Sequence, residues 1–375
     1  MLFIKIKYCA IYIVTLMFLS FVMYFIFIQN EPNYRSIEPK RPLTIVEEKQ
    51  RVFFLKTHKC AGTTIQNILM RYGHKENLDF LLPNKNNYVG NPEHFNISMV
   101  INVTADNKFD LFVHHTRYSQ DVKSVMRSGT FFVTILREPT SLFQSMYSFY
   151  HFEKKYKNNL TKFISNLSNN SSFRKNVQRY SKKLGINQMS WDLGMAPEDF
   201  ESTKMINKFI DIIENDFDFI MIFEYLDASL VLFANLMQWP LERVAYLPLN
   251  TSNDTHKPII TNYDVMQLEK VNMADNMLYK WFLEKFKEKI YKYGIKKLKI
   301  GIGKLMAINQ EIREKCVKSI TNKGYAKTFS YELKENTNIC QYITMNELKY
   351  TSYLRNTQYE RHRKYKALDK LMNNN

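Results

Sequence analysis

Four short apolar runs, each followed by polar residues, mark out the central part of the chain. They occupy residues 52–55, 109–113, 130–136 and 217–223 and are rich in the β-branched and aromatic residues typical of buried strands. Apolar residues at helical spacing follow three of these runs and recur near the C-terminus, at residues 65–72, 140–152, 229–239, 278–298 and 348–370. Strands that alternate with helices predict an α/β fold with a parallel sheet.

The loop after the first run, residues 56–64, has the composition of an anion-binding loop. It holds Lys56, Lys59, Gly62 and three threonines, and a helix follows it. A strand–loop–helix junction presents backbone N–H groups and a positive helix end to an anion, so we expect a bound phosphate or sulfate group. The standard P-loop is absent, because its lysine follows the second glycine. An ordinary junction with solvated lysines is the alternative.

Two more strand ends carry candidate chemistry. His114 and His115 follow the second run, where ligands sit in open α/β sheets, and histidine is the commonest general base near neutral pH. The alternative is a structural pair that caps the strand. Arg137 follows the third run, and Ser145 lies about two turns into the next helix, so both can reach one phosphate. A solvated arginine at a helix start is the alternative there.

The N-terminus predicts a membrane anchor. Residues 8–28 carry no charge and are long enough to cross a bilayer, and Lys5 and Lys7 precede them. We therefore expect a cytoplasmic tail at 1–7, a signal anchor at 8–28, a proline-containing stem at 29–50 and a luminal body at 51–375, with a basic C-terminal part from about residue 300. N-glycosylation sequons fit a lumen and begin at Asn96, Asn102, Asn159, Asn166, Asn169, Asn170, Asn250 and Asn253.

Composition narrows the picture further. The net charge of +17 implies anionic partners without choosing among nucleic acid, lipid, glycan and nucleotide. No cysteine or histidine cluster has metal-ligand spacing, so no metal site is expected. Cys316 and Cys340 can pair in an oxidising lumen, and Cys60 is interpreted as a small loop residue. The polar, sequon-rich stretch 156–183 is expected to be an exposed loop.

The chain resembles the galactose-3-O-sulfotransferase family of Golgi carbohydrate sulfotransferases, which includes galactosylceramide sulfotransferase. The resemblance is carried, in the family's order, by FFLKTHKCAGTTIQNIL, FDLFVHHTRY, TFFVTILREPTSLFQSMYSFYHF, NQMSWDLG, FEYLDASLVLFANLMQW and LKYTSYLRNTQY. It implies a single-pass type II Golgi membrane protein whose body is a three-layer sandwich with a central parallel sheet and a P-loop-like phosphosulfate loop. It also implies 3′-phosphoadenylyl sulfate as donor, no metal, and the 3-OH of a galactose in a glycolipid or glycan, rather than nucleic acid, as acceptor.

The resemblance also implies residue roles. His115 would be the general base and Lys59 the motif lysine, with Arg137 and Ser145 on the 3′-phosphate of the donor and His114 and Arg117 toward the acceptor. The 5′-phosphosulfate would lie against Thr57, Lys59, Cys60, Ala61, Gly62, Thr63 and Thr64. Cys60 departs from the family pattern, in which a threonine follows the lysine, so a hydroxyl contact would be lost there.

Three alternatives stay open. A uronosyl 2-O-sulfotransferase uses a similar loop and histidine. A P-loop nucleotide kinase or NTPase would need a complete phosphate loop and a magnesium-binding acid after a later strand, whereas Asp110 begins its strand. A catalytically inactive, membrane-anchored glycan-binding protein would keep the fold without needing Lys59 or His115.

Overall fold

The central feature is a parallel sheet of four strands. The computed structural model describes residues 49–90, 92–101, 104, 106–177, 185–249, 260–321 and 329–373. Strands β1 (Val52–Leu55), β2 (Leu111–Phe112), β3 (Phe131–Leu136) and β4 (Phe219–Ile222) run in the order β2-β1-β3-β4, and every pairing is parallel. The α/β fold with a parallel sheet is therefore confirmed. Strand β2 is shorter than the apolar run that predicted it, because Phe109 forms only an isolated bridge to Met126.

The strands are buried on both faces, which explains why they read as continuous apolar runs. All four residues of β1 are fully buried. The ring of Phe53 packs against those of Phe112 and Phe132, on the two neighbouring strands, at centroid distances of 5.3 and 5.1 Å.

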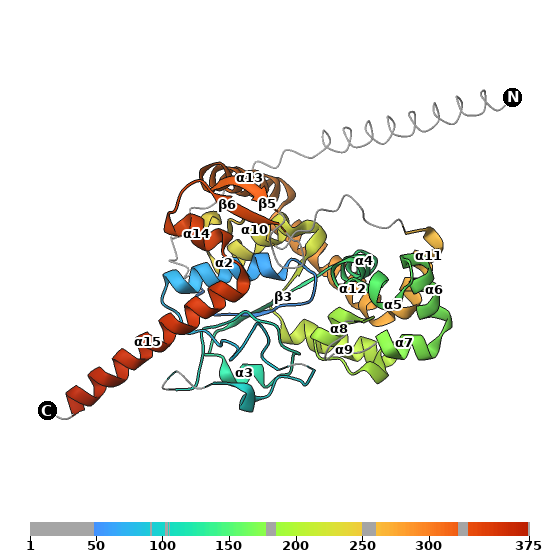
Figure 1. Ribbon diagram of the computed structural model, residues 1–375, viewed down its shortest axis with the longest axis horizontal. Helices are drawn as coiled ribbons and strands as arrows, with labels where there is room; N and C mark the ends of the chain where they lie inside the picture. Colours follow the sequence, from blue (N-terminus) through green and yellow to red (C-terminus); the bar gives the residue numbers. More distant parts are fainter. Residues whose placement is uncertain are drawn as a thin grey trace, which may run out of the picture. The chain divides into compact units, whose positions relative to one another are not determined.

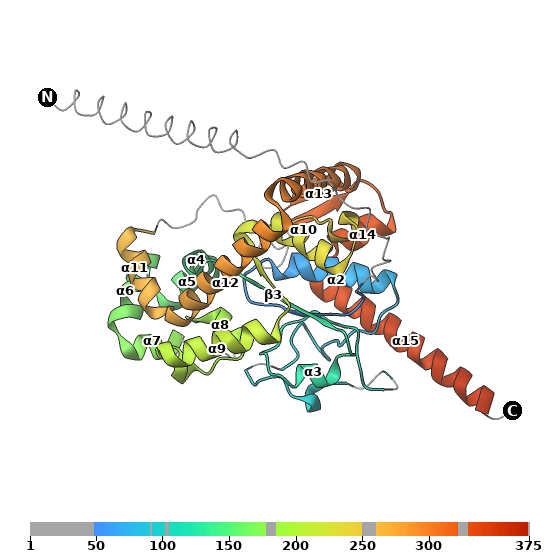
Figure 2. The same cartoon turned by 180° about the vertical axis from the view of Figure 1, so that it is seen from behind.

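Helices cover both faces of the sheet. In the view of Figure 1, α2 (Gly62–Lys75), α10 (Leu226–Met237) and α13 (Ile295–Cys316) lie above the strands, and α3 (Val122–Val125), α8 (Gln188–Asp192) and α9 (Thr203–Asp216) lie below them; Figure 2 shows the same layers from behind. The other helices are α4 (Pro139–Phe149), α5 (Phe152–Tyr156), α6 (Leu160–Asn169), α7 (Ser171–Val177), α11 (Asn262–Val271), α12 (Met273–Tyr293), α14 (Asn338–Thr344) and α15 (Glu347–Asn373).

The expected exposed loop at 156–183 is wrong over its described part, residues 156–177. Helix α6 begins at Leu160, where the Asn159 side chain caps it by accepting from the Lys162 N–H at 2.9 Å. Leu160, Phe163 and Leu167 are buried on one face, so helical periodicity outweighs the polar composition.

The prediction of one helix over residues 278–298 is also wrong. The segment belongs to two helices, because Gly294 separates α12 from α13 with a φ of 96°.

The sequons occupy varied positions. Asn96, Asn159, Asn169 and Asn170 are exposed and Asn166 is half-buried. Asn102, Asn250 and Asn253 lie outside the described residues, as do the expected tail, membrane span and residues 29–48 of the stem. Among the described residues, no helix combines the length and apolar character that crossing a membrane requires.

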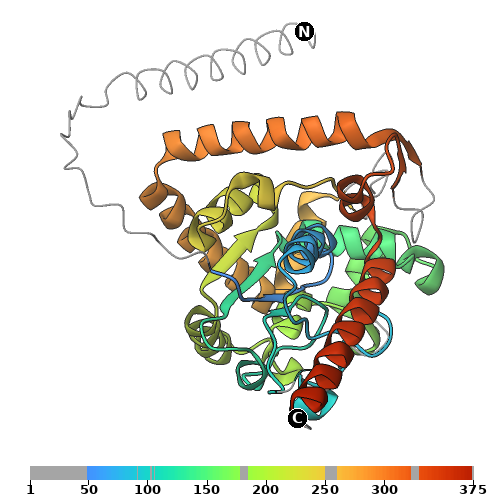
Figure 3. The same cartoon turned by 90° about the vertical axis from the view of Figure 1, so that its left-hand side faces the viewer.

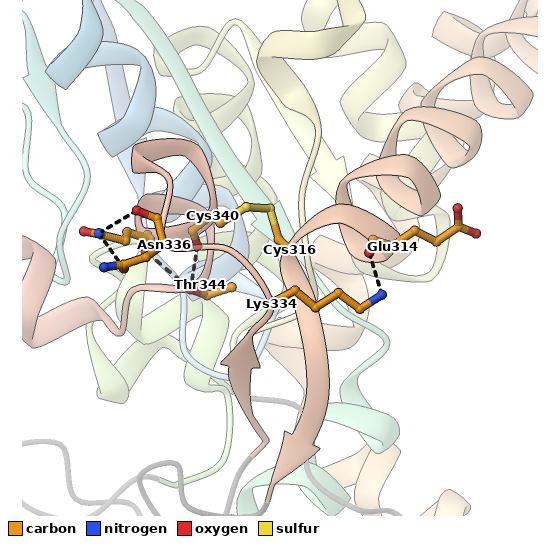
Figure 4. The surroundings of a disulfide bond; sticks show 7 residues. Glu314, Cys316, Lys334, Asn336, Cys340 and Thr344 are labelled. Carbon is orange, nitrogen blue, oxygen red and sulfur yellow. Dashed lines mark hydrogen bonds between the residues drawn. A yellow bond between two sulfur atoms is a disulfide. The ribbon is translucent and has the colours of Figure 1, made fainter.

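A C-terminal subassembly packs beside α2. A two-stranded antiparallel hairpin, β5 (Val317–Thr321) and β6 (Ser330–Leu333), follows the long helix α13, which Figure 3 shows nearly full length. A disulfide joins Cys316, at the end of α13, to Cys340 in α14 (Figure 4). This is the pairing that the sequence allows. Helix α15 begins at Glu347, beside Lys56 at the end of β1, and packs against α2 before it runs on to the C-terminus (Figure 1).

Candidate active site

The candidate site lies where the strand order reverses. The chain moves from β1 to β2 on one side and then to β3 and β4 on the other, so the switch point falls between β1 and β3. Ligands of open α/β sheets bind beyond the carboxyl ends of the strands at such a point. Residues 56–61 leave β1 there, His115 follows β2 nearby, and Arg137 follows β3.

Two residues of the loop after β1 adopt the left-handed backbone conformation. Lys59 and Ala61 have φ values of 58° and 57°, and Ala61 precedes α2 without a side-chain cap. Within the described residues, no acceptor takes the backbone N–H groups of Ala61 and Gly62. Helix α2 has no acidic residue in its first turn. This end of the loop therefore presents unneutralised N–H groups and a positive helix end, the elements that bind anions.

Several loop side chains hold the loop rather than face solvent. The Thr57 hydroxyl donates to the Ile135 carbonyl at 2.6 Å, and the Thr64 hydroxyl accepts from the Leu249 N–H at 3.3 Å. Burial raises the pKa of Cys60 to about 12, so this residue is a neutral thiol and not a nucleophile. Lys59 and Thr63 are half-exposed, and the Lys59 ammonium lies 3.5 Å from the ring centroid of Phe149.

Arg137 connects β3 to this loop. Its Nη1 donates to the Lys59 carbonyl at 2.9 Å, and its guanidinium lies over the Phe223 ring. Its Nε and Nη2 both donate to the Ser141 hydroxyl, at 3.0 and 2.8 Å. The hydroxyl that contacts Arg137 thus belongs to Ser141, one turn before the expected Ser145, which is half-exposed on the same helix.

His115 is oriented by the same loop. Its Nδ1 lies 2.7 Å from the Lys56 carbonyl. Because a carbonyl can only accept, Nδ1 carries the proton of the neutral ring and Nε2 keeps a lone pair. Nε2 makes no hydrogen bond with any described residue. Burial, assisted by the neighbouring His58 and Lys56, holds the pKa of His115 well below its usual value, so the ring is a neutral base at pH 7.

His58 is a functional candidate that the sequence analysis missed. Its ring stacks on that of His115 at 4.4 Å, and its Nδ1 lies 2.9 Å from the Asp192 carboxylate. Its Nε2 lies 2.8 Å from the Tyr88 hydroxyl, and the Tyr88 ring also stacks on His115, at 4.9 Å. The sequence did offer a reason to consider it, because His58 lies between Lys56 and Lys59 in the loop that follows the first strand.

His114 and Arg117 are held away from the loop. His114 is fully buried, its Nε2 lies 2.9 Å from the Thr351 hydroxyl of α15, and burial lowers its pKa to about 3. Arg117 stacks its guanidinium 3.3 Å from the Trp191 ring centroid and donates to the Met195 carbonyl at 2.9 Å. Of the two histidines, only His115 therefore contacts the loop. Over the described part of the chain, no group of three or more His, Cys, Asp or Glu can hold a metal ion.

Comparisons with known protein sequences identify the family of this chain. The sequence model of the galactose-3-O-sulfotransferase family matches residues 6–328. Galactosylceramide sulfotransferase of Homo sapiens is 30% identical over 278 residues, which cover 72% of this chain and 65% of the relative. The Mus musculus protein is 29% identical with the same coverage, and galactose-3-O-sulfotransferase 2 of Sus scrofa is 25% identical over 82% of this chain and 84% of its own length. The chain thus spans just under two thirds of the galactosylceramide sulfotransferases, and it belongs to the galactose-3-O-sulfotransferase family.

Proposed function

We propose that this protein transfers a sulfuryl group from 3′-phosphoadenylyl sulfate to a sugar hydroxyl, the 3-OH of a galactose. One observation carries the proposal. Two carbonyls of the same loop, those of Lys56 and Lys59, hold the imidazole of His115 and the guanidinium of Arg137. A general base and a basic anion-binding region therefore converge on one short segment, which is the arrangement that group transfer from an anionic donor needs.

The residues present fit such a donor. The 5′-phosphosulfate needs cationic and N–H donors, which Lys59, the N–H groups of Ala61 and Gly62 and the start of α2 provide. The 3′-phosphate needs a second cation, and the planar fork of Arg137 binds phosphate oxygens in pairs. Ser145, half-exposed one turn beyond Ser141, is the hydroxyl that we assign to the same phosphate.

The chemistry follows from the state of His115. Its neutral Nε2 accepts the proton of the galactose hydroxyl as the oxygen attacks sulfur. The bond between sulfur and the bridging oxygen of the donor breaks, and its electron pair stays on the leaving phosphate. In-line transfer is assumed by analogy with phosphoryl transfer. Lys59 and the loop N–H groups stabilise the charge that develops on the bridging oxygen.

The decisive test is donor-dependent sulfation by the full chain. With labelled 3′-phosphoadenylyl sulfate, we expect label on galactosylceramide or on a β-galactose-terminated oligosaccharide, and loss of label when the galactose 3-OH is methylated. Label on an iduronate-containing glycan instead would indicate a uronosyl 2-O-sulfotransferase. No transfer to any sugar would leave the inactive glycan-binding alternative. The relatives' name, galactosylceramide sulfotransferase, makes the glycolipid the first acceptor to test.

The proposal includes a place in the cell. We propose a single-pass type II Golgi membrane protein with a luminal body, supported by the uncharged stretch 8–28 and by the disulfide between Cys316 and Cys340, since disulfides persist in oxidising compartments. In sealed Golgi vesicles, protease should spare residues 51–375, and N-glycosidase should reduce the apparent mass. A body digested without detergent would contradict this orientation.

A further inference from the structure

Helix α15 brings the Glu347 carboxylate into contact with the loop of the candidate site. Glu347, its first residue, lies 2.7 Å from the ammonium of Lys56, and the two side chains are 11% and 3% exposed. The same ammonium donates to the Gln66 side chain at 2.7 Å. Burial alone would raise the pKa of Glu347, but the charge and hydrogen bond of Lys56 outweigh it and lower the pKa. The pair is therefore a buried ion pair, which is costly to break on one side.

Lys56, the partner of Glu347 in this ion pair, also holds His115. The Lys56 carbonyl binds Nδ1 of the imidazole at 2.7 Å. The Asn87 carbonyl accepts the backbone N–H of His115 at 3.2 Å, and the Asn87 side chain helps to lower the pKa of Glu347. The carboxylate thus holds the residue whose carbonyl sets the position of the imidazole.

Helix α15 is rigidly attached around this contact. Thr351 meets His114, the Gln358 side chain bonds the Phe80 backbone at 2.7 and 2.9 Å, and Arg355 donates to the Pro83 carbonyl at 2.7 Å. The helix lies beyond residue 328, where the match to the family model ends. Glu347 pairs with Lys56, in the part of the loop that holds His115 rather than Arg137.

We infer that Glu347 is a positioning residue for the reaction, acting through Lys56 to hold the His115 imidazole in register with the sugar hydroxyl. This inference rests on the proposed function. The ion pair of Glu347 is with Lys56 and involves neither Lys59 nor Arg137, so losing it should affect turnover and not nucleotide binding. A purely structural role would instead lower the stability of the fold and leave the turnover of folded molecules unchanged.

The test compares Glu347→Gln with the matched control Glu360→Gln. Glu360 lies on the same helix, but its side chain is 48% exposed and forms an ion pair with Arg363 on the same face of the helix. We expect Glu347→Gln to lower kcat roughly ten- to hundredfold, as a small misplacement of a catalytic group does. The KM for the donor and the Kd for adenosine 3′,5′-bisphosphate should stay within twofold, and the control should match the wild type.

Two further measurements make the outcome decisive. If Glu347→Gln does not fold, Glu347→Asp keeps the charge at a shorter reach and should show the same loss in kcat to a smaller degree. In a cycle of Lys56→Met, Glu347→Met and the double variant, the losses in kcat should not multiply, because both substitutions release the same attachment. Wild-type kcat in the folded Glu347 variants, losses that multiply, or an equal loss of nucleotide binding would overturn the inference. An inactive wild type would instead overturn the proposed function.

Discussion

At the residue scale, the protonation of His115 is determined by its surroundings. The Lys56 carbonyl fixes the tautomer, and the rings of His58 and Tyr88 stack on the imidazole. Replacing His115 by alanine removes the base while the anion-binding part of the loop stays in place. We expect kcat to fall by about 10²–10⁴-fold, the usual contribution of a positioned base. The Kd for adenosine 3′,5′-bisphosphate, measured by calorimetry, should stay within a few-fold. Activity retained within a few-fold would exclude His115 as the base.

The protonation of His115 also predicts how kcat depends on pH. A general base works only when it is unprotonated, so activity is lost as pH falls through its pKa. Burial holds the pKa of His115 well below the usual value of 6.5, and this places the acid limb of the profile at lower pH than for a solvated histidine. We expect kcat to be nearly the same at pH 6.0 and pH 7.5, values chosen to bracket the ordinary histidine pKa of about 6.5. A kcat that falls severalfold between pH 7.5 and 6.0 would contradict a neutral, buried base.

The assignment of Arg137 to the 3′-phosphate of the donor is tested by measuring nucleotide affinity. In Arg137→Ala we expect the Kd for adenosine 3′,5′-bisphosphate to rise, because a charge-assisted hydrogen bond contributes about 1.5–3 kcal/mol. Arg137→Lys should recover only part of the affinity, since an ammonium lacks the planar fork. The control is Arg363→Ala on α15, whose side chain is 65% exposed. An unchanged Kd in Arg137→Ala would reject the assignment to the 3′-phosphate.

At the scale of elements, the start of α2 depends on a glycine. A Cβ at Gly62 would come within 2.7 Å of the Lys56 Cγ, whereas a Cβ at Gly303, inside α13, meets nothing within 4 Å. Gly→Ala in an open helix position stabilises by about 1 kcal/mol. We therefore expect Gly303→Ala to raise the free energy of unfolding by about that amount and Gly62→Ala to lower it by about 1–3 kcal/mol through overpacking. Urea unfolding measures both. Equal shifts in the two variants would show that the loop accommodates the extra methyl group.

The sequence predicts those elements whose signal is local. Continuous apolar runs located β1, β3 and β4, and Pro139 correctly marked the first turn of α4. Because all strands are parallel, residues that directly follow a strand meet at one edge, which is why His115, Arg137 and the lysine loop were found. Residues 160–167 were predicted to be a loop because the segment is rich in asparagine and serine. Its apolar residues are recognisable as the buried face of a helix only from their helical spacing.

The rest of the site depends on contacts between distant parts of the chain. Asp192 binds His58 across 134 positions, and Glu347 binds Lys56 from the C-terminal helix. No periodicity or spacing links such residues, since their proximity is a result of how the layers pack. The contact between Arg137 and the Ser141 hydroxyl was not predicted either, and the role of Ser145 on the phosphate stays a prediction.

At the scale of the whole molecule, the disulfide ties the C-terminal elements to the body without being the sole attachment of α15. Cys316 and Cys340 are 24 positions apart, and closing a loop of that length in the unfolded chain is worth about 3.5 kcal/mol. We expect the double variant Cys316→Ser/Cys340→Ser to lower the free energy of unfolding by about this amount. Far below the melting temperature, kcat should stay near the wild-type value, because Thr351, Arg355 and Gln358 still hold α15 in place.

A reductant provides the matched control for that variant. Dithiothreitol should lower the Tm of the wild type toward that of the double variant and leave the Tm of the double variant unchanged, since Cys60, the free cysteine of the described residues, is buried as a neutral thiol. An equal shift in both proteins would place the sensitivity elsewhere in the chain. If the double variant stays folded but its kcat falls, the disulfide helps to hold Glu347 against Lys56. The contacts of Thr351, Arg355 and Gln358 would then not be enough to keep the carboxylate in place.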